Sequence, residues 1–228
     1  MELTKAIEAW ANPKRAEISK RFFKTGAGEY GEGDIFIGLT VPQCRIIAKK
    51  FSTITLQEIK VHLESKIHEE RLISLLILVD QYKKTQNQEI IDFYVANTRH
   101  INNWDLVDTT ADKILGNYVT DKNKSILYTL AKSSNIWERR IAIVATYHFI
   151  KNNKFEDTLK IAKILLLDKH DLIRKAVGWM LREVGKRNNT LLKDFLKENY
   201  KIMPRTMLRY AIEKFPELKR QQYLQGVL

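Results

Sequence analysis

Residues 136–144 read Ile136-Trp137-Glu138-Arg139-Arg140-Ile141-Ala142-Ile143-Val144, in which Arg140 directly precedes an apolar run. The same order recurs where Arg71, Arg174 and Arg209 each stand before a mainly apolar stretch. These four arginines lie 69, 34 and 35 residues apart, so the first gap spans two periods. Apolar residues at spacings of three and four predict helices across the four stretches, residues 69–84, 136–151, 171–186 and 206–215.

A period of 34 to 35 residues with two helices per unit is typical of an α-solenoid. Tetratricopeptide and ankyrin arrays have similar periods, but their signature motifs are missing from this sequence, whereas a HEAT-like array fits. We therefore expect an all-α chain: a right-handed α-solenoid of HEAT-like helical repeats with a concave basic groove. Residues 1–228 are expected to form this array as a single domain.

Equivalent positions in such an array line up along its concave surface, so the recurring arginine predicts a basic stripe that follows a phosphate backbone. The alternative is that each arginine caps or pairs with a neighbouring helix. The unit expected near residue 105 departs from the series, because it carries Trp104, Asp105 and Asp108. The loss of the basic residue there marks a place for a function other than phosphate binding.

The residues around Trp104 form the candidate site. Asn103 and the asparagine before it are good N-caps for a helix that begins at Trp104. Asp105 would then lie in the first turn, where a charge that offsets the exposed amides explains it. Asp108 lies four residues after Trp104, so both project from one face of the helix. An ion pair with Arg140 is the structural alternative for Asp108, and it would keep the carboxylate ionised.

The remaining tryptophans receive two interpretations. Trp10 and Trp137 are interpreted as core residues. Trp179 stands beside Gly178 and before a basic run, and an aromatic face among basic residues suits a stacking or sugar contact in nucleic acid. The basic run consists of Arg182, Lys186 and Arg187.

Charge and cysteine content restrict the partner and the compartment. The 39 Lys and Arg against 27 Asp and Glu give a formal net charge of +12, which favours a polyanionic partner such as nucleic acid. The alternative is a lysine-rich surface that only keeps the protein soluble. Cys44 alone cannot form an internal disulfide, and the first residues contain no apolar signal region. We expect a cytoplasmic protein with no membrane association.

Two other patterns are set aside. Gly26-Ala27-Gly28-Glu29-Tyr30-Gly31 matches the dinucleotide-binding pattern, but a helix precedes it where a strand is required, so we interpret it as a loop. The five histidines have no metal-ligand spacing, and no metal or cofactor is expected. Cys44 is interpreted as a small core residue within a helix.

Four further motifs stand in register with the repeat: Ile37-Gly38-Leu39-Thr40-Val41-Pro42-Gln43-Cys44-Arg45, Asn103-Trp104-Asp105-Leu106-Val107-Asp108, Asn135-Ile136-Trp137-Glu138-Arg139-Arg140 and Lys175-Ala176-Val177-Gly178-Trp179-Met180-Leu181-Arg182-Glu183. On these motifs the sequence resembles, across nearly its whole length, the AlkD-type DNA alkylation-repair glycosylases. The resemblance implies that Asp108 is the catalytic carboxylate and that Trp104 and Trp179 pack around the deoxyribose of the damaged nucleotide. It implies that Arg140 lies at the same cleft, near the backbone phosphates.

The resemblance also implies the reaction and the partner. A DNA N-glycosylase of this kind removes cationic alkylated purines from duplex DNA without enclosing the lesion, and we expect a monomer. The further DNA-binding candidates are Arg71, Arg174, Lys175, Arg182 and Arg209. Two departures concern substrate range: Phe22 stands where the family has a Tyr, and the stretch Gly26–Gly33 is longer than in the best-known members. The rival functions are a non-catalytic repeat protein that binds bent or branched DNA, and a HEAT scaffold that binds acidic proteins.

Overall fold

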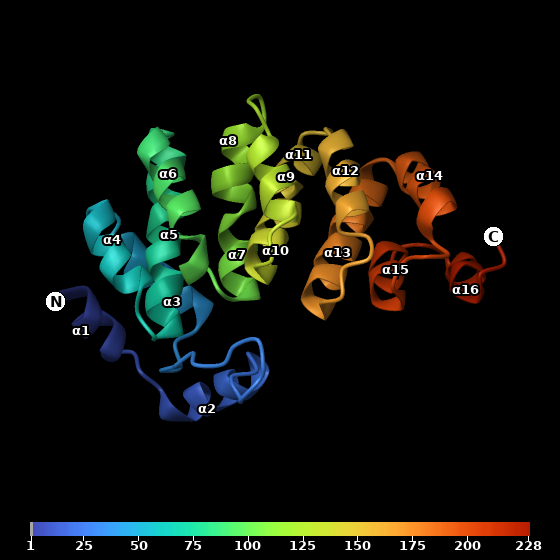
Figure 1. The fold of residues 1–228 in the computed structure, drawn as a ribbon. Coiled ribbons are helices and arrows are strands. Elements are labelled where there is room, and N and C mark those ends of the chain that lie inside the picture. The colour runs from blue at the N-terminus through green and yellow to red at the C-terminus, as the bar shows by residue number, and fades with distance from the viewer. Residues whose placement is uncertain (1) are drawn as a thin grey trace. The chain divides into compact units, whose positions relative to one another are not determined.

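The computed structural model describes residues 2–228, and its helices are shown in Figure 1. No β-strand occurs within this range, although a single parallel bridge joins Ile35 and Ile67. The all-α class predicted from helical spacing is therefore confirmed. The chain divides into two compact units, residues 1–110 and 111–228. A single domain, a right-handed solenoid and a concave groove stay predictions.

The first unit is organised around its longest helix, α5 (His68–Thr85). This helix contacts α3, α4 and α7, and so it is buried on most sides: Ile73, Leu75 and Ile77 are fully buried. Capping boxes begin α3 and α4, at Thr40 and Thr55. The other elements of the unit are α1 (Glu2–Glu8), α2 (Pro13–Phe22), α3 (Val41–Lys50), α4 (Leu56–Leu63), α6 (Gln88–Ala96), the 3-10 turn η1 (Thr98–His100) and α7 (Trp104–Thr110).

The second unit stacks helices around α13 (Asp171–Arg187). This helix contacts α10 and α15 on the one hand, and α12 and α14 on the other, which is the pairing expected of helical repeats. Figure 1 shows α10, α13 and α15 in succession along the unit. The other elements are the π-helical η2 (Asp112–Gly116), α8 (Asn117–Val119), α9 (Ser125–Ala131), α10 (Ile136–Ala145), α11 (Tyr147–Lys151), α12 (Glu156–Ile164), α14 (Asn189–Asn199), α15 (Arg205–Ala211) and α16 (Glu217–Gln225).

Two helix boundaries differ from the sequence expectation. The helix expected over residues 136–151 is interrupted at Thr146, whose hydroxyl donates to the carbonyl of Ile143 at 2.7 Å. Such side-chain bonds compete with the backbone ladder and disturb helices. The helix expected over residues 206–215 ends at Ala211, since the backbone turns after this residue.

Several single-residue expectations can be compared directly. Cys44 is fully buried in α3 and Trp137 is 7% exposed in α10, so both core predictions are confirmed. The prediction for Trp10 is wrong, because its side chain follows the end of α1 and is 42% exposed. The stretch Gly26–Gly33 forms turns after α2, and no helix begins directly after it, which confirms the loop interpretation. Across residues 2–228, no helix has both the length and the apolar character needed to cross a bilayer.

Candidate active site

Helix α7 carries the candidate catalytic and sugar-binding residues of the first unit. It begins at Trp104, whose backbone amide donates to Oδ1 of Asn103 at 2.8 Å, which confirms the predicted cap. Asn103 is fully buried. Trp104 and Asp108 are both half-buried and lie one turn apart on the same helix. The helix therefore presents an indole and a carboxylate from one face.

Trp104 is held by aromatic neighbours at the end of α2 and directly after it. Its ring stacks on Phe23, with centroids 5.2 Å apart and an angle of 17°, and Phe22 contacts it edge-on at 5.8 Å. Its indole Nε1 donates to the hydroxyl of Tyr30 at 3.3 Å. Tyr30 belongs to the glycine-rich stretch, so this loop places a hydroxyl close to Phe22, the residue that stands where the family has a Tyr. Sequence reasoning did not select Tyr30, because nothing in the sequence showed that the loop folds back on α7.

Asp105 has a second role besides its place in the first turn of α7. Its Oδ1 accepts from the Leu106 amide at 2.9 Å, while its Oδ2 lies 2.8 Å from Nε2 of His68 on α5. The other ring nitrogen of His68, Nδ1, lies 3.1 Å from Asp34. An imidazole therefore joins two carboxylates beneath the start of α7. The scattered spacing of the histidines predicts no site, so the sequence alone does not identify His68 and Asp34 as partners.

Arg71 takes part in this network and not in a surface stripe. It is 3% exposed, its Nη2 pairs with Asp34 at 2.6 Å, and its Nη1 donates to the carbonyl of Ser65 at 2.7 Å. Burial and these partners favour the pairing alternative over phosphate contact for Arg71. The guanidinium beside Asp34 has an electrostatic effect as well. Although burial raises the pKa of the Asp34 carboxyl, its hydrogen bond from His68 and the charge of Arg71 lower that pKa overall.

The contact between Arg71 and Ser65 recurs in the second unit and corrects the register of the arginine series. Arg139 donates from Nη1 to the carbonyl of Ser133, and Arg174 donates from Nε to the carbonyl of Asp168. In all three cases the acceptor lies six residues earlier, in the turn before the helix. The position equivalent to Arg71 is therefore Arg139, one residue before the Arg140 that the apolar run suggested.

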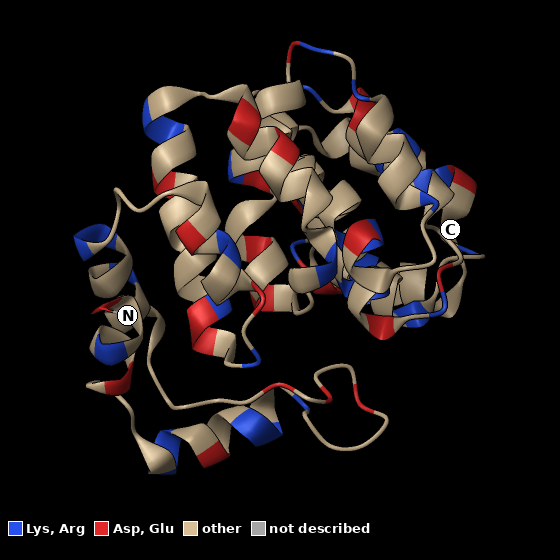
Figure 2. Ribbon diagram, turned by 60° about the vertical axis from the view of Figure 1, so that its left-hand side comes forward, with Lys and Arg blue, Asp and Glu red and all other residues tan. Residues whose placement is uncertain are grey.

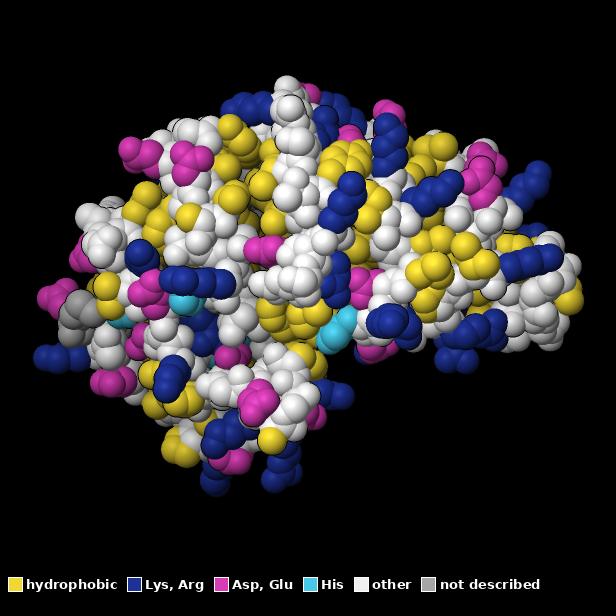
Figure 3. Space-filling model, in the orientation of Figure 1, with side chains coloured by type: hydrophobic (Ala, Val, Ile, Leu, Met, Phe, Trp, Pro, Cys, Tyr) yellow, Lys and Arg dark blue, Asp and Glu magenta, His cyan; other side chains and the backbone are white. Residues whose placement is uncertain are grey.

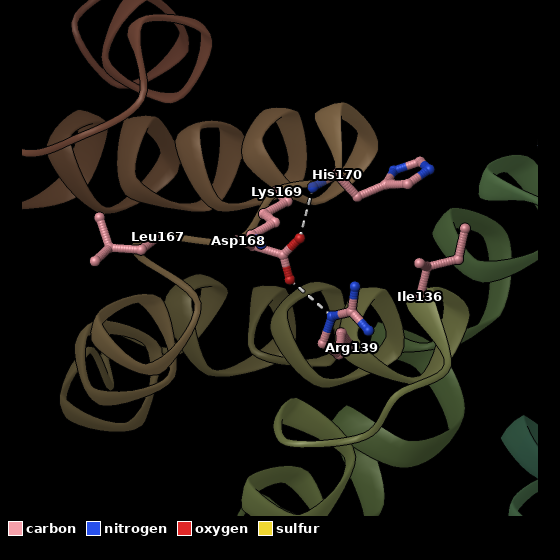
Figure 4. Close-up of a pocket in the computed structure, with 6 residues that line it drawn as sticks. All are labelled: Ile136, Arg139, Leu167, Asp168, Lys169 and His170. Atoms are coloured by element: carbon pink, nitrogen blue, oxygen red, sulfur yellow. Dashed lines mark hydrogen bonds and ion pairs between the residues drawn. The ribbon is translucent and has the colours of Figure 1, made fainter.

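Figure 4 shows Arg139 in its surroundings. Its Nε lies 2.7 Å from a carboxylate oxygen of Asp168, whose other oxygen accepts from the backbone amide of His170 at 2.8 Å. An open cavity of about 480 Å³ adjoins this pair, lined by Ile136, Arg139, Leu167, Asp168, Lys169 and His170. Arg139 and Asp168 thus join α10 to the turn that precedes α13.

The candidates on α10, α13 and α15 differ in exposure. Arg140 is 5% exposed and donates from Nη1 to the carbonyl of Leu172, Arg174 is half-buried, and Arg209 is exposed. Lys175 pairs with Asp171 at 2.7 Å, and Arg182 pairs with Glu213. Three arginines expected on one surface thus range from buried to exposed.

Trp179 is half-buried on α13 and meets Tyr147 of α11 at a tilted angle of 44°, with centroids 5.8 Å apart. Lys151 lies 4.9 Å above the ring of Tyr147, and Arg187 lies 6.0 Å from it. These cations lie over the ring of Tyr147, which neighbours Trp179, and the nucleic-acid contact expected of Trp179 stays a prediction. Tyr147 and Lys151 were not selected from the sequence, because the break at Thr146 that places them was not foreseen.

The model of the family described as DNA alkylation repair enzyme matches residues 3–215 of the chain. The chain belongs to the DNA alkylation repair enzyme family. A comparison with curated proteins gives no match. Among solved structures, a predicted DNA alkylation repair enzyme from Enterococcus faecalis is 19% identical, with a TM-score of 0.75, over 91% of this chain and 97% of that chain. AlkD2 from Streptococcus mutans is 20% identical, with a TM-score of 0.58, over 78% of this chain and 91% of that chain.

A third similar structure, smu.31 from Streptococcus mutans UA159, is 21% identical, with a TM-score of 0.56, over 78% of this chain and 93% of that chain. At these identities the likeness establishes the fold, and family membership rests on the match to residues 3–215. The resemblance that the four sequence motifs indicated is therefore confirmed.

The charge of this DNA alkylation repair family member is distributed over both units. In Figure 2, Lys and Arg and Asp and Glu are both scattered over the helices and loops. The face shown in Figure 3 likewise has basic side chains separated by acidic and apolar ones. Many surface cations have acidic neighbours, as Lys175 and Arg182 do. The excess of +12 over the whole chain still favours an anionic partner, and the family's name identifies that partner class as DNA.

Proposed function

We propose that the protein is a DNA N-glycosylase that hydrolyses the N-glycosidic bond of cationic alkylated purines, of the 7-methylguanine and 3-methyladenine type, in duplex DNA. The observation that carries this proposal is the joint presentation of Trp104 and Asp108 by α7, in a chain of the DNA alkylation repair enzyme family. The aromatic neighbours that fix Trp104 and the buried cap that fixes the start of α7 give this pair a defined geometry.

The chemistry needs little more than this pair. Alkylation at N3 or N7 of a purine leaves a positive charge on the base, so the base departs without a general acid. Positive charge then grows on the sugar as the bond breaks, and one ionised carboxylate near that carbon stabilises it and orients a water molecule. We assign that role to Asp108. The indole face of Trp104 also favours a nearby cation.

Residues of the second unit are proposed as DNA contacts. Trp179, beside Tyr147 and Lys151, offers an aromatic surface with cations close by, which suits a sugar or base contact. The proposed backbone contacts are Arg174, Lys175, Arg182 and Arg209, whose side chains are half-buried or exposed. Arg71 and Arg140 are not among them, because both guanidiniums are buried and bound within the protein, Arg71 to Asp34 and Ser65 and Arg140 to the carbonyl of Leu172.

The test measures release of 7-methylguanine and 3-methyladenine from methylated duplex DNA by the wild type and by Asp108→Asn. The substitution keeps the shape of the side chain and removes the charge that the sugar cation needs. Release should fall by two to three orders of magnitude, as for loss of one preorganised electrostatic contact, with DNA affinity unchanged or higher. Asp92→Asn on α6 removes an exposed carboxylate from the same unit and should release base as the wild type does. If the wild type releases no base, the protein is a non-catalytic DNA-binding member of the family.

A further inference from the structure

The first four residues of α5 are buried polar groups, which is unusual because such groups are stable inside a protein only when they are paired. Each of them has partners. Glu69 accepts from the backbone amides of residues 37–39, at 2.8 to 3.3 Å, and Glu70 lies 3.3 Å from Nδ1 of His62. His68 and Arg71 share Asp34. The buried polar side chains at the start of α5 therefore hold the neighbouring backbone in place.

His68 has a partner set that determines its protonation. Nδ1 faces a carboxylate oxygen of Asp34 at 3.1 Å, and Nε2 faces one of Asp105 at 2.8 Å. An ionised carboxylate only accepts hydrogen bonds, and a neutral imidazole has a single N–H to donate. Both contacts are hydrogen bonds only if the ring is an imidazolium.

The electrostatic surroundings of His68 also favour the imidazolium. Burial works to lower the pKa of His68, but the charge and hydrogen bond of Asp105 and the hydrogen bond of Asp34 outweigh it and raise that pKa to about 9. The charge of Arg71 acts in the opposite direction. At neutral pH two cations, His68 and Arg71, thus face two carboxylates, Asp34 and Asp105.

The ring of His68 is fixed in a second way, by stacking. Phe36 lies against it with centroids 4.5 Å apart, and Phe23 lies 5.0 Å away. An aromatic face attracts a cation, so these rings favour the imidazolium. Phe23 in turn stacks on Trp104. His68 is therefore connected to Trp104 in two ways: through Asp105, which is next to Trp104 in the first turn of α7, and through Phe23.

Asp34 extends the arrangement to the loop and to the cap of α7. It follows the stretch Gly26–Gly33 directly, and its carboxylate accepts from Nδ2 of Asn103 at 3.3 Å. The side-chain oxygen Oδ1 of Asn103 accepts from the backbone amide of Trp104. The buried Asp34 carboxylate thus links α5, the end of the glycine-rich stretch and the first residue of α7.

We propose that His68 is a positioning residue: a doubly hydrogen-bonded imidazolium that joins Asp34 to Asp105 and thereby sets the orientation of Trp104 and Asp108 on α7. Its side chain is 2% exposed, so it touches no substrate and acts only through these neighbours. The kinetic part of this inference rests on the proposed glycosylase activity, whereas the protonation and geometry of His68 do not.

The first experiment uses the full-length wild type and needs no activity. Long-range ¹H–¹⁵N correlation spectra of the histidine rings, recorded from pH 6 to 10, should show both nitrogens of His68 protonated at pH 7 and a single titration near pH 9. The indole N–H resonance of Trp104 should move with the same midpoint. His100, whose pKa is lowered by burial and by the charge of Arg99, should be neutral at pH 7 in the same spectra. A neutral, single-tautomer His68 at pH 7, or a Trp104 resonance that ignores its titration, would overturn the proposal.

The second experiment measures base release by His68→Gln, with His100→Gln as the matched control from the same unit. Because His68 orients groups that act in the transition state, kcat should fall about tenfold or more while KM changes less than threefold. His100→Gln should match the wild type. Equal kcat for His68→Gln and wild type would contradict the proposal. If the wild type itself releases no base, the proposed function fails and the wild-type spectra alone decide the role of His68.

Discussion

The indole Nε1 of Trp104 donates to the hydroxyl of Tyr30 at 3.3 Å, and this bond connects α7 to the glycine-rich stretch 74 residues earlier. The same hydroxyl lies 3.5 Å from the carbonyl of Phe22 at the end of α2. Trp104 is thus held at its polar edge by Tyr30 and on its face by Phe23. A tryptophan fixed at both places keeps one orientation toward a ligand.

Tyr30→Phe should weaken base release without weakening DNA binding. One neutral hydrogen bond contributes about 1 kcal/mol, so release should fall by less than about tenfold, and the free energy of unfolding should fall by about 1 kcal/mol or less. Tyr128→Phe is the matched control, since it removes a tyrosine hydroxyl that donates to Asp157 at 2.6 Å in the other unit. Its release should equal that of the wild type. Wild-type kinetics for Tyr30→Phe would show that the bond to Trp104 has no role.

Gly178→Ala should destabilise the second unit. A Cβ at this position would lie 2.5 Å from the carbonyl oxygen of Met207 and 2.5 Å from Cβ of Tyr210, so α13 and α15 would have to separate. Overpacking of this kind costs about 1–3 kcal/mol. Gly185→Ala on the same helix is the control, because its Cβ would meet the flexible end of the Leu192 side chain. Urea unfolding should show a clear loss for Gly178→Ala and a smaller change for Gly185→Ala; equal losses would contradict the packing argument.

The sequence was sufficient for the helical class, for the family and for the start of α7, because these depend on local patterns. Apolar spacing identifies α5, α10 and α13, and an asparagine before Trp104 predicts a cap that Asn103 indeed provides. The residues that carry these signals lie within a few positions of the helix or cap that they specify.

The partners of the site were not predictable in the same way. The contacts of His68 with Asp34 and Asp105 span 34 and 37 residues, and that of Trp104 with Tyr30 spans 74. A histidine among charged residues gives no sign in the sequence that it will be buried between two carboxylates. The register error between Arg139 and Arg140 has a related cause: apolar runs mark the helix, whereas the contact that defines the repeat is a bond to a backbone carbonyl.

Substitution of Arg209 should weaken DNA binding, whereas substitution of Arg71 should lower stability. Arg209 is exposed on α15, so Arg209→Ala should lower the slope of log affinity against log salt by about one and leave the free energy of unfolding within about 0.5 kcal/mol of the wild type. Arg71→Ala leaves Asp34 buried without its guanidinium and should cost about 3–5 kcal/mol. Lys193→Ala on α14 removes an exposed cation outside the proposed contacts and should leave the slope unchanged. A slope unchanged by Arg209→Ala would remove this residue from the DNA interface.

The stability of the protein should fall as the pH rises from 7 to 8.5, and His68 is the reason. Burial alone would lower the pKa of His68, but Asp105 and Asp34 raise it from 6.5 to about 9. A group whose folded pKa is raised contributes stability that is fully present below its unfolded pKa and is lost as the pH rises through its folded pKa. The whole contribution is about 3 kcal/mol, and between pH 7 and 8.5 the free energy of unfolding should fall by about 1 kcal/mol per pH unit.

This pH window isolates His68 from the other titrating groups. His100, His148 and His170 have lowered pKa values, so they reduce stability only as the pH falls below their ordinary range. Cys44, whose pKa burial raises from 9.0 to about 12, reduces stability only above pH 9. Urea unfolding at half-unit steps from pH 7 to 8.5 should therefore show the slope in the wild type and in His100→Gln, and a much flatter profile in His68→Gln. A wild-type profile that is flat over this range would mean that His68 is neutral in the folded protein, and that the Asp34 carboxylate is held by Arg71 and Asn103 without an imidazolium.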